Sequence, residues 1–305
     1  MTRRVAVVDI GSTSIQLTIA DVHSDRVDVL RKEKRIARLA DELDERGHLS
    51  ARALEQILDA LRHFQVLVKE ASVSISVTAT ATLRAAKNQR EIIATIRQTL
   101  GITIQVLSGA DEARLVLGGV LFGHPELREQ RLLAVDVGGG SSELITGLKG
   151  RAATIASVPI GSLVAHQKWL GFEQPNWSCV RQARAFIRSR FSNSVQFSRS
   201  VDIDTLVATG GTIQRLVRLA HGRIMVSDEI DGEWLSQDEL NECIERLIRA
   251  KTPQGRRALA GIDPDRSDFI LGGALIYAVI MEEFKATGWR VSTSALRTGM
   301  LTRPN

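Results

Sequence analysis

Two stretches of glycine, hydroxyl and carboxylate residues carry the clearest chemistry in this sequence. The longer, Leu132–Thr146, is an apolar run ending at Asp136, followed by Gly138–Gly140, two serines and Glu143. Three glycines let backbone N–H groups approach an anion closely, because no Cβ intervenes and positive φ is accessible. The flanking carboxylates could hold a divalent cation, which takes oxygen ligands. Taken alone, the stretch also fits an ordinary glycine hairpin with a solvated acidic residue.

The chain opens with a second version of the same pattern. Residues Val5–Ile19 again run from an apolar strand to Asp9, then to Gly11 and the hydroxyl residues Ser12–Ser14. The two copies lie about 125 residues apart, far beyond the ~20–50-residue period of a solenoid repeat. We therefore expect two similar domains that face each other across a cleft, each contributing one phosphate loop.

Length and composition fit a two-domain globular protein. The chain has 305 residues, of which 44% are hydrophobic and 25% charged, and domains usually span ~100–200 residues. No apolar run approaches the ~20 residues that cross a bilayer, and the N-terminus lacks a signal-peptide core, so we expect a cytoplasmic protein without membrane contact. Cys179 and Cys243 have no metal-ligand spacing and are predicted to be reduced structural residues.

The net charge of +5 favours an anionic partner. The basic residues are spread along the chain, however, and 4% aromatic residues with a single tyrosine provide few stacking platforms. Nucleic-acid binding is therefore not expected, and a basic surface alone is usually just a solvated one.

The elements that must position these loops alternate between strand and helix patterns, as in an α/β fold. Besides the two hairpins, strands are predicted at 26–30, 73–77, 102–107, 153–158, 205–208 and 291–294. Helices are predicted at 50–67, 89–100, 108–117, 236–250, 269–284 and 295–301. We expect a first domain over 1–125 and a second over 126–305, with a last helix at about 295–303 that could pack back on the first.

A carboxylate and an arginine stand out beside the hairpins. Ser108 with Asp111 three residues later resembles a capping box, which places Glu112 in the first turn of a helix that opens on the expected cleft. Such a carboxylate is often only a partner of the helix dipole, so both roles stay open here. Arg84 could bind a phosphate bidentately or be an ordinary surface arginine.

Two further segments have weaker signals. The connection from Arg31 to Asp44 is rich in cations and could edge the cleft, but we interpret it as a solvated loop or helix face, with Arg38 as the exception. The glycine pair before Thr212 follows a strand and precedes a helix. That position suits phosphate contact at a helix N-terminus, and it equally suits close packing.

Taken in order, these motifs resemble the exopolyphosphatase and guanosine pentaphosphate phosphohydrolase (Ppx/GppA) family, within the actin–hexokinase–sugar kinase superfamily. The similarity covers nearly the whole chain. The segments that carry it are Asp9-Ile-Gly-Ser-Thr-Ser14, Arg38-Leu-Ala-Asp41, Ala79-Thr-Ala-Thr-Leu-Arg84, Ser108-Gly-Ala-Asp-Glu-Ala-Arg114, Asp136-Val-Gly-Gly-Gly-Ser-Ser-Glu143, Ala208-Thr-Gly-Gly-Thr212 and Ser294-Ala-Leu-Arg-Thr-Gly299. Gly-Gly-Thr alone is weak, whereas the ordered set is highly specific.

The resemblance implies two RNase H-like (actin-like ATPase) domains with mixed sheets flanked by helices, facing each other across a cleft. It implies a phosphoanhydride hydrolase acting on inorganic polyphosphate, on the 5′-phosphate of pppGpp, or on both. Glu112 would be the catalytic carboxylate that orients or deprotonates water. Asp9, Asp136 and Glu143 would position Mg²⁺, with Mn²⁺ as an alternative. The implied phosphate-binding residues are Ser12, Thr13, Arg84, Gly138, Gly139, Gly140, Ser141, Gly211 and Thr212.

The sequence departs from the family pattern at several positions. Thr13 replaces the usual asparagine of the first loop, which leaves one hydroxyl donor in place of an amide. Ala85, Asp111 and Thr298 replace family carboxylates. The sequence ends at Asn305, without the helical C-terminal domains of longer members, so we expect a shorter substrate or less processive action. A homodimer remains an option.

Two alternatives to the hydrolase stay open. The same two-loop cleft would serve a small-molecule kinase that transfers the γ-phosphate of ATP, although no adenosine pocket beyond the glycine pair stands out. The changes at Thr13, Ala85 and Thr298 would fit a sensor that binds polyphosphate or an alarmone (guanosine penta- or tetraphosphate) without turnover. We favour the hydrolase because Glu112 and both loops are present.

Overall fold

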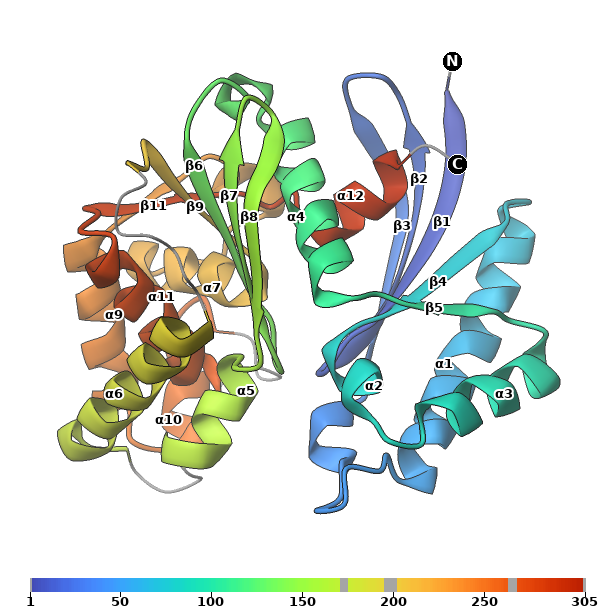
Figure 1. The fold of residues 1–305 in the computed structure, drawn as a ribbon, viewed down its shortest axis with the longest axis horizontal. Coiled ribbons are helices and arrows are strands. Elements are labelled where there is room, and N and C mark those ends of the chain that lie inside the picture. Colours follow the sequence, from blue (N-terminus) through green and yellow to red (C-terminus); the bar gives the residue numbers. More distant parts are fainter. Residues whose placement is uncertain (1, 171–174, 195–201, 263–267, 304–305) are drawn as a thin grey trace.

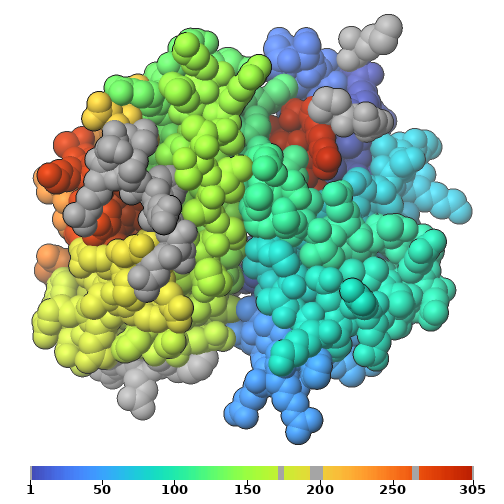
Figure 2. All heavy atoms as spheres, in the orientation of Figure 1, coloured from blue at the N-terminus to red at the C-terminus, as the bar shows by residue number. Residues whose placement is uncertain are grey.

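A computed structural model describes residues 2–170, 175–194, 202–262 and 268–303, which form two halves, each built on one β-sheet (Figure 1). In the space-filling view of Figure 2, the yellow-green residues of the second half meet the cyan and blue residues of the first along a boundary that crosses the molecule. A cleft of about 630 Å³ is lined by residues from both sheets.

The first sheet has five strands in the order β3-β2-β1-β4-β5. β1 (Arg3–Ile10), β2 (Ser14–Val22) and β3 (Val27–Ile36) form an antiparallel meander. β4 (Ile75–Ala79) and β5 (Ile104–Val106) continue the sheet parallel to β1. Because side chains alternate along a strand, one face of β1 and β2 packs on α1 and α3, while the opposite face carries Asp9.

The second sheet repeats this plan with one additional strand, in the order β10-β11-β9-β6-β7-β8. The meander consists of β6 (Leu132–Val137), β7 (Ser142–Leu148) and β8 (Arg151–Val158). The parallel strands are β9 (Thr205–Thr209) and β11 (Gly288–Val291). The additional strand β10 (Trp234–Ser236) pairs antiparallel with β11.

Helices cover the faces of both sheets. The central helix of the second half, α11 (Ile270–Glu283), is buried along most of its length, as expected for a helix that is apolar on all sides. The other α-helices are α1 (Ala51–Glu70), α2 (Ala81–Ala85), α3 (Gln89–Leu100), α4 (Gly109–Gly123), α5 (Ser162–Ala165), α6 (Trp177–Ser194), α7 (Gly211–His221), α8 (Ser227–Ile230), α9 (Gln237–Arg249), α10 (Pro253–Arg257) and α12 (Leu296–Thr302). Shorter turns are η1 (Leu39–Glu42), η2 (Pro125–Leu127) and the π-helical η3 (His166–Leu170).

α4 and α12 exchange sides between the two halves. α4 follows the first sheet in sequence but packs on β6, β7 and β8, whereas α12 follows the second sheet and packs on β1 and β2. The two helices also pack against each other, and Figure 1 shows them side by side between the sheets. Apolar residues of the two helices, such as Val116 and Met300, share one core with Val7 of β1 and Leu132 of β6. The domain boundary at residue 125 stays a prediction.

The predicted fold class of two mixed sheets flanked by helices is confirmed. The helix over residues 89–100 has the predicted bounds, and Ser236 and Glu239 form a capping box at the start of the helix predicted over 236–250. The prediction for the charged connection was wrong in part, because Arg31–Ile36 continues β3. The last strand lies earlier than predicted, at Gly288–Val291, and β10 was not predicted.

Helix lengths and composition in the described ranges also bear on the membrane prediction. None of the helices found there is long and apolar enough to cross a bilayer.

Candidate active site between two glycine hairpins

The two hairpins have the same turn geometry. In the first, the Gly11 N–H donates to the Ser14 carbonyl at 3.0 Å, and in the second the Gly138 N–H donates to the Ser141 carbonyl at 3.0 Å. A Cβ at either glycine would lie 3.2 Å from that serine oxygen, which is closer than a side chain usually comes. Both turns therefore favour glycine for the same steric reason.

The hairpin tips meet across the cleft. A Cβ at Gly139 would lie 2.6 Å from Thr13 Oγ1, and a Cβ at Gly140 would lie 2.8 Å from Ser12 Oγ. The tips can approach this closely only because the second one has no side chains there. The predicted arrangement of two glycine and hydroxyl loops that face each other is therefore present in the structure.

Hydrogen bonds to neighbouring segments hold the first tip in place. Thr82 Oγ1 donates to Ser12 Oγ at 2.8 Å, and the Thr13 carbonyl accepts from the N–H groups of Ala37 and Arg38. Thr13 Oγ1 itself is buried and has no hydrogen-bond partner among the described residues. Leaving a buried hydroxyl without a partner costs free energy, so this group is suited to donate to a bound ligand. Thr13 thus retains a donor where the family has an asparagine.

The second tip is held by the segment that follows β8. The Ser162 N–H donates to the Gly138 carbonyl at 2.9 Å, and the Leu163 N–H donates to the Gly139 carbonyl at 3.0 Å. Gly161 approaches so closely that a Cβ there would lie 2.5 Å from the Gly139 carbonyl carbon. Because these two carbonyls are hydrogen-bonded to the segment after β8, the backbone of the tip has a fixed conformation at the cleft.

Glu112 lies in the first turn of α4 and lines the cleft with only 7% of its surface exposed. Ser108 caps this helix by accepting from the Asp111 N–H, as predicted. Arg84 Nη1 donates to Glu112 Oε2 at 2.8 Å and to the Leu107 carbonyl at 2.9 Å. Burial raises the pKa of Glu112 to about 7, although the bond and charge of Arg84 act in the opposite direction. At neutral pH this carboxyl can therefore either accept or release a proton.

Three further carboxylates gather around Glu112. Asp9 and Asp136 are the last residues but one of equivalent strands, and Glu143 lies opposite Asp136 on β7. Burial, opposed by the nearby charge of Arg297, raises the pKa of Asp9 to about 6. Burial, together with the charges of Glu112 and Asp136, raises the pKa of Glu143 well above its ordinary value. The cluster thus concentrates negative charge that a cation would compensate.

The carboxylates fit a magnesium ion that retains several waters. Asp9 Oδ1 is buried and has no hydrogen-bond partner in the described ranges, which leaves an oxygen lone pair available. All donors are hard oxygens, the ligands that Mg²⁺ prefers. Within the described residues, however, no three His, Cys, Asp or Glu side chains converge on one potential metal position. Water would therefore have to complete the coordination, and Mg²⁺ commonly binds in this way.

The far end of the cleft is formed by the start of α7. Gly210 has a φ of 92°, and a Cβ there would lie 2.4 Å from Asp136 Oδ1, so this position requires glycine. Gly211 lines the cleft, whereas Thr212 is buried against Gly273 of α11. Arg84 and Thr212 are thus absent from the described residues that line the cleft.

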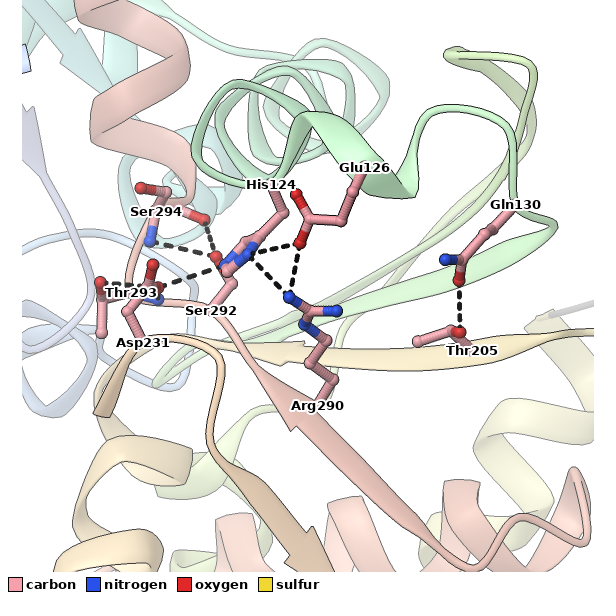
Figure 3. Close-up of polar contacts among 9 residues, drawn as sticks. All are labelled: His124, Glu126, Gln130, Thr205, Asp231, Arg290, Ser292, Thr293 and Ser294. Carbon is pink, nitrogen blue, oxygen red and sulfur yellow. Dashed lines mark hydrogen bonds and ion pairs between the residues drawn. The ribbon is translucent and has the colours of Figure 1, made fainter. Parts of the chain in front are cut away.

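A polar cluster around His124 fixes another part of the cleft wall (Figure 3). His124 follows the last residue of α4, and its Nε2 lies 3.3 Å from Asp231 Oδ1. The same oxygen accepts from the N–H of Thr293 at 2.7 Å. Burial alone would raise the pKa of Asp231, but hydrogen bonds from His124 and Thr293 lower it instead. Thr293 and Ser294 line the cleft, so the cluster connects α4, which carries Glu112, to the segment before α12.

Most of the predicted site residues come together. The cleft is lined by Asp9, Ser12, Thr13, Glu112, Asp136, Gly138, Gly139, Gly140, Ser141, Glu143 and Gly211. It is also lined by polar residues to which sequence reasoning gave no role in the site: Gln16, Arg215, Arg218 and Arg297. Lys32 and Lys34, which belong to the connection that could edge the cleft but was interpreted as a solvated face, line it as well. Arg297 could have been found, because it lies in the closing motif that supported the family resemblance.

Arg38, the predicted exception in the charged connection, makes contacts elsewhere. Its Nε donates to Asp41 at 2.6 Å and its Nη1 donates to Asp268 of the second half at 3.2 Å. Gln167 Nε2 donates to the other oxygen of Asp41 at 2.6 Å. Arg38 and Asp41 therefore link the two halves.

Comparison with known proteins gives consistent results. The sequence model described as the Ppx/GppA phosphatase family matches residues 18–304. Exopolyphosphatase 1 of Mycobacterium tuberculosis is 26% identical over 303 residues, covering 98% of this chain and 88% of its own length. The Mycobacterium leprae protein of the same name is 27% identical over 305 residues, with 98% and 89% covered.

Solved structures resemble the whole chain. A Ppx/GppA family member from Aquifex aeolicus has a TM-score of 0.85 at 25% identity, covering 99% of this chain and 97% of its own. An exopolyphosphatase from Cytophaga hutchinsonii has a TM-score of 0.87 at 25% identity, with 98% and 96% covered. The likeness therefore extends over both halves and the cleft between them.

Proposed function

This chain belongs to the Ppx/GppA phosphatase family, and from that premise we propose that it is an exopolyphosphatase, a hydrolase that releases terminal orthophosphate from inorganic polyphosphate. The observation that supports this most directly is Glu112, a buried carboxyl with a pKa raised to about 7 that faces two glycine and hydroxyl loops. A general base works best when its pKa lies near the operating pH.

Glu112 would act on the attacking water. The water oxygen forms a bond to the terminal phosphorus while the bond from that phosphorus to the bridging oxygen breaks. The water proton passes to a Glu112 carboxylate oxygen, and the shortened chain leaves with the electron pair of the broken bond. Arg84, at 2.8 Å from Glu112, keeps this carboxyl oriented. Phosphoryl transfer depends mainly on such positioning and on charge neutralisation.

The hairpin tips would bind the terminal phosphates. Thr13 Oγ1 provides a donor with no partner among the described residues, and Ser12 lies beside it. The backbone of Gly138–Gly140, whose carbonyls at the first two positions bond away from the cleft, can approach the phosphate oxygens without steric hindrance. Arg84 would act through Glu112, because the carboxylate already occupies its Nη1 group.

Mg²⁺ is the cofactor that we propose. Asp9, Asp136 and Glu143 would hold it, partly through water, and the buried oxygen of Asp9 supports that assignment. When bound, the ion supplies a positive charge that neutralises the phosphate oxygens. The protein side chains orient the substrate and move the proton.

The 5′-phosphate of pppGpp is a second substrate for the same chemistry. Polar residues that line the cleft beyond the tips, including Gln214, Arg218 and Asp228, support a ligand larger than a single phosphate. The two substrates share the reacting phosphates and differ only in the group attached beyond them, so a direct comparison of rates can distinguish them.

The decisive variant is Glu112→Gln, which retains the shape and the Arg84 contact but cannot accept a proton. Phosphate release from tripolyphosphate, long-chain polyphosphate and pppGpp should be measured with and without Mg²⁺. We expect a loss of ~10²–10⁴-fold in kcat. Asp111→Asn is the matched control, because Asp111 is the exposed neighbour of Glu112.

Three other outcomes would contradict the proposal. Unchanged turnover in the Glu112→Gln protein would remove the assigned base. ATP turnover that requires an added alcohol or acid would indicate a kinase. Binding of polyphosphate or pppGpp without any release of phosphate by the wild-type protein, in either Mg²⁺ or Mn²⁺, would indicate a sensor.

A further inference from the structure

A one-residue bulge in β3 turns two lysines toward the cleft. Ile19 of β2 pairs with Arg31, but the next residue, Ala20, pairs with Val29, so Leu30 is the additional residue. Side chains alternate along a strand, and a bulge reverses that alternation. The cleft is accordingly lined by Val27 and Val29 before the bulge and by Lys32 and Lys34 after it.

Lys34 belongs to a row of side chains that begins at the reacting centre. Asp9 of β1 pairs with Gln16 of β2, and Gln16 pairs with Lys34 of β3. Directly paired residues place their side chains on the same face of a sheet. Neighbouring strands lie ~4.8 Å apart, so Lys34 starts about 10 Å from Asp9. The adjacent row carries Lys32, which pairs with Thr18.

Arg297 brings a further positive charge to the same side of the cleft. It lies in the first turn of α12, which packs on β1 and β2. Among the described residues, no side-chain hydrogen bond or ion pair involves Lys32 or Arg297. Loss of surrounding water lowers the pKa of Lys32, the charge of Arg297 lowers it further, and Asp228 opposes both. These cations are therefore close enough to repel each other, and an anion between them would relieve the repulsion.

We propose that Lys32, Lys34 and Arg297 form a second anion site, which binds the internal phosphates of a chain whose terminal phosphate lies at the hairpin tips. This inference rests on the proposed function only for the direction in which the bound phosphate chain runs, from the hairpin tips toward β3. The ligand is a run of three or more linked phosphates, either in inorganic polyphosphate or in a nucleoside polyphosphate. Lys32 lies four residues before Ile36, the residue of β3 that pairs with Ser14 at the first tip, or ~13 Å along the strand. Pyrophosphate bound at the tips would therefore not extend as far as Lys32.

The test uses Lys32→Gln with Arg35→Gln as the matched control, because Arg35 lies on the same strand but on the opposite face. We expect Lys32→Gln to raise KM for tripolyphosphate and long-chain polyphosphate about 10-fold with kcat unchanged. KM for pyrophosphate should not change, and Arg35→Gln should match the wild type with every substrate. Arg297→Gln should weaken tripolyphosphate binding to a similar extent. A pppGpp arm distinguishes a nucleotide from an inorganic chain, and a response to either one supports the site.

Calorimetric titration of tripolyphosphate into the Glu112→Gln protein separates this inference from the hydrolase proposal. Suppose that the wild-type protein hydrolyses none of the substrates, but adding Lys32→Gln to the Glu112→Gln protein weakens its tripolyphosphate binding about 10-fold. The anion site then stands and the enzymatic proposal fails. If hydrolysis occurs but Lys32→Gln behaves like Arg35→Gln, or affects pyrophosphate equally, the anion site is refuted. Circular dichroism melting of each variant verifies that the fold is intact.

Discussion

At the matching position of the two glycine hairpins, the first carries an amide, Gln16, and the second carries a carboxylate, Glu143. Each lies directly opposite its aspartate across the hairpin. Gln16 Nε2 donates to the serine two residues before it at 2.9 Å, whereas Glu143 Oε1 accepts from the equivalent serine at 2.8 Å. The same backbone therefore supports hydrogen bonds of opposite direction.

The difference extends onto the third strand of each sheet. Gln16 pairs with Lys34, whereas Glu143 pairs with Ser157, whose Oγ donates to Glu143 at 2.9 Å. Both third strands also have a bulge at a corresponding place, after Ile19 and after Thr146 of the preceding strand. The first row thus ends in a lysine that would suit phosphate, whereas the second carries a carboxylate, held by a serine, that would suit a metal ion. If the proposed function holds, the two copies of the scaffold would contribute differently to phosphate and metal binding.

The strongest test of this division makes the second hairpin resemble the first. Glu143→Gln retains the size of the side chain and an oxygen that can accept from Ser141 and Ser157. It removes one of the three carboxylates that we assign to Mg²⁺, so we expect kcat to fall about 100-fold and the Mg²⁺ requirement to rise. Phosphate release across a Mg²⁺ titration measures both. Wild-type kcat at saturating Mg²⁺ would show that the two rows do not differ in function.

A smaller effect is expected from the reciprocal change. Gln16→Glu places a carboxylate beside Asp9 and Lys34, where it would repel phosphate and compete for the lysine. We expect KM for tripolyphosphate to rise about 10-fold with a modest change in kcat. The double variant Gln16→Glu/Glu143→Gln conserves net charge and should remain as impaired in kcat as Glu143→Gln. Recovery of activity in the double variant would mean that either hairpin can perform the carboxylate task.

Much of this architecture follows from local sequence signals. The hairpins were predictable because glycine and hydroxyl clusters interrupt alternating apolar runs, and the turn requires glycine at Gly11 and Gly138. The start of α4 was predictable because Ser108 caps it, which correctly placed Glu112 in its first turn. These features depend on residues within a few positions of one another.

The features that were missed depend on contacts distant in sequence. The charged end of β3 forms a strand because β2 provides its hydrogen-bond partners, and the bulge at Leu30 decides which lysines face the cleft. The partnership of Arg84 with Glu112 joins residues from two helices. Neither of these has a local signature in the sequence. Arg297 differs, because its motif was recognised and the return of its helix to the first domain was expected as an option, and only its place in the cleft was missed.

The mildest test concerns the stability of the metal-free protein, since only the second hairpin has a buried carboxylate at this position. The pKa of Glu143 is raised in the folded state, so the folded protein binds the proton more tightly than the unfolded chain does. Stability from this group is therefore present at low pH and is lost as pH rises above the ordinary range of a glutamate. Glu143→Gln, which mimics the protonated form, should match the wild type at pH 5 and be more stable than the wild type at pH 9.

Urea unfolding in the presence of EDTA at both pH values measures this difference, and Glu55→Gln provides the control for the same change at an exposed position. Added Mg²⁺ should stabilise the wild type more than Glu143→Gln, because an ion that binds only the folded state adds to its stability. If Glu143→Gln is less stable than the wild type at pH 9, the ionised Glu143 side chain makes a favourable net contribution to the free energy of unfolding. In that case Glu143 would have a structural role, and the difference between the two hairpins would need another explanation. A gain in stability combined with a loss of turnover would instead show that the second hairpin retains its carboxylate for catalysis at the expense of folding.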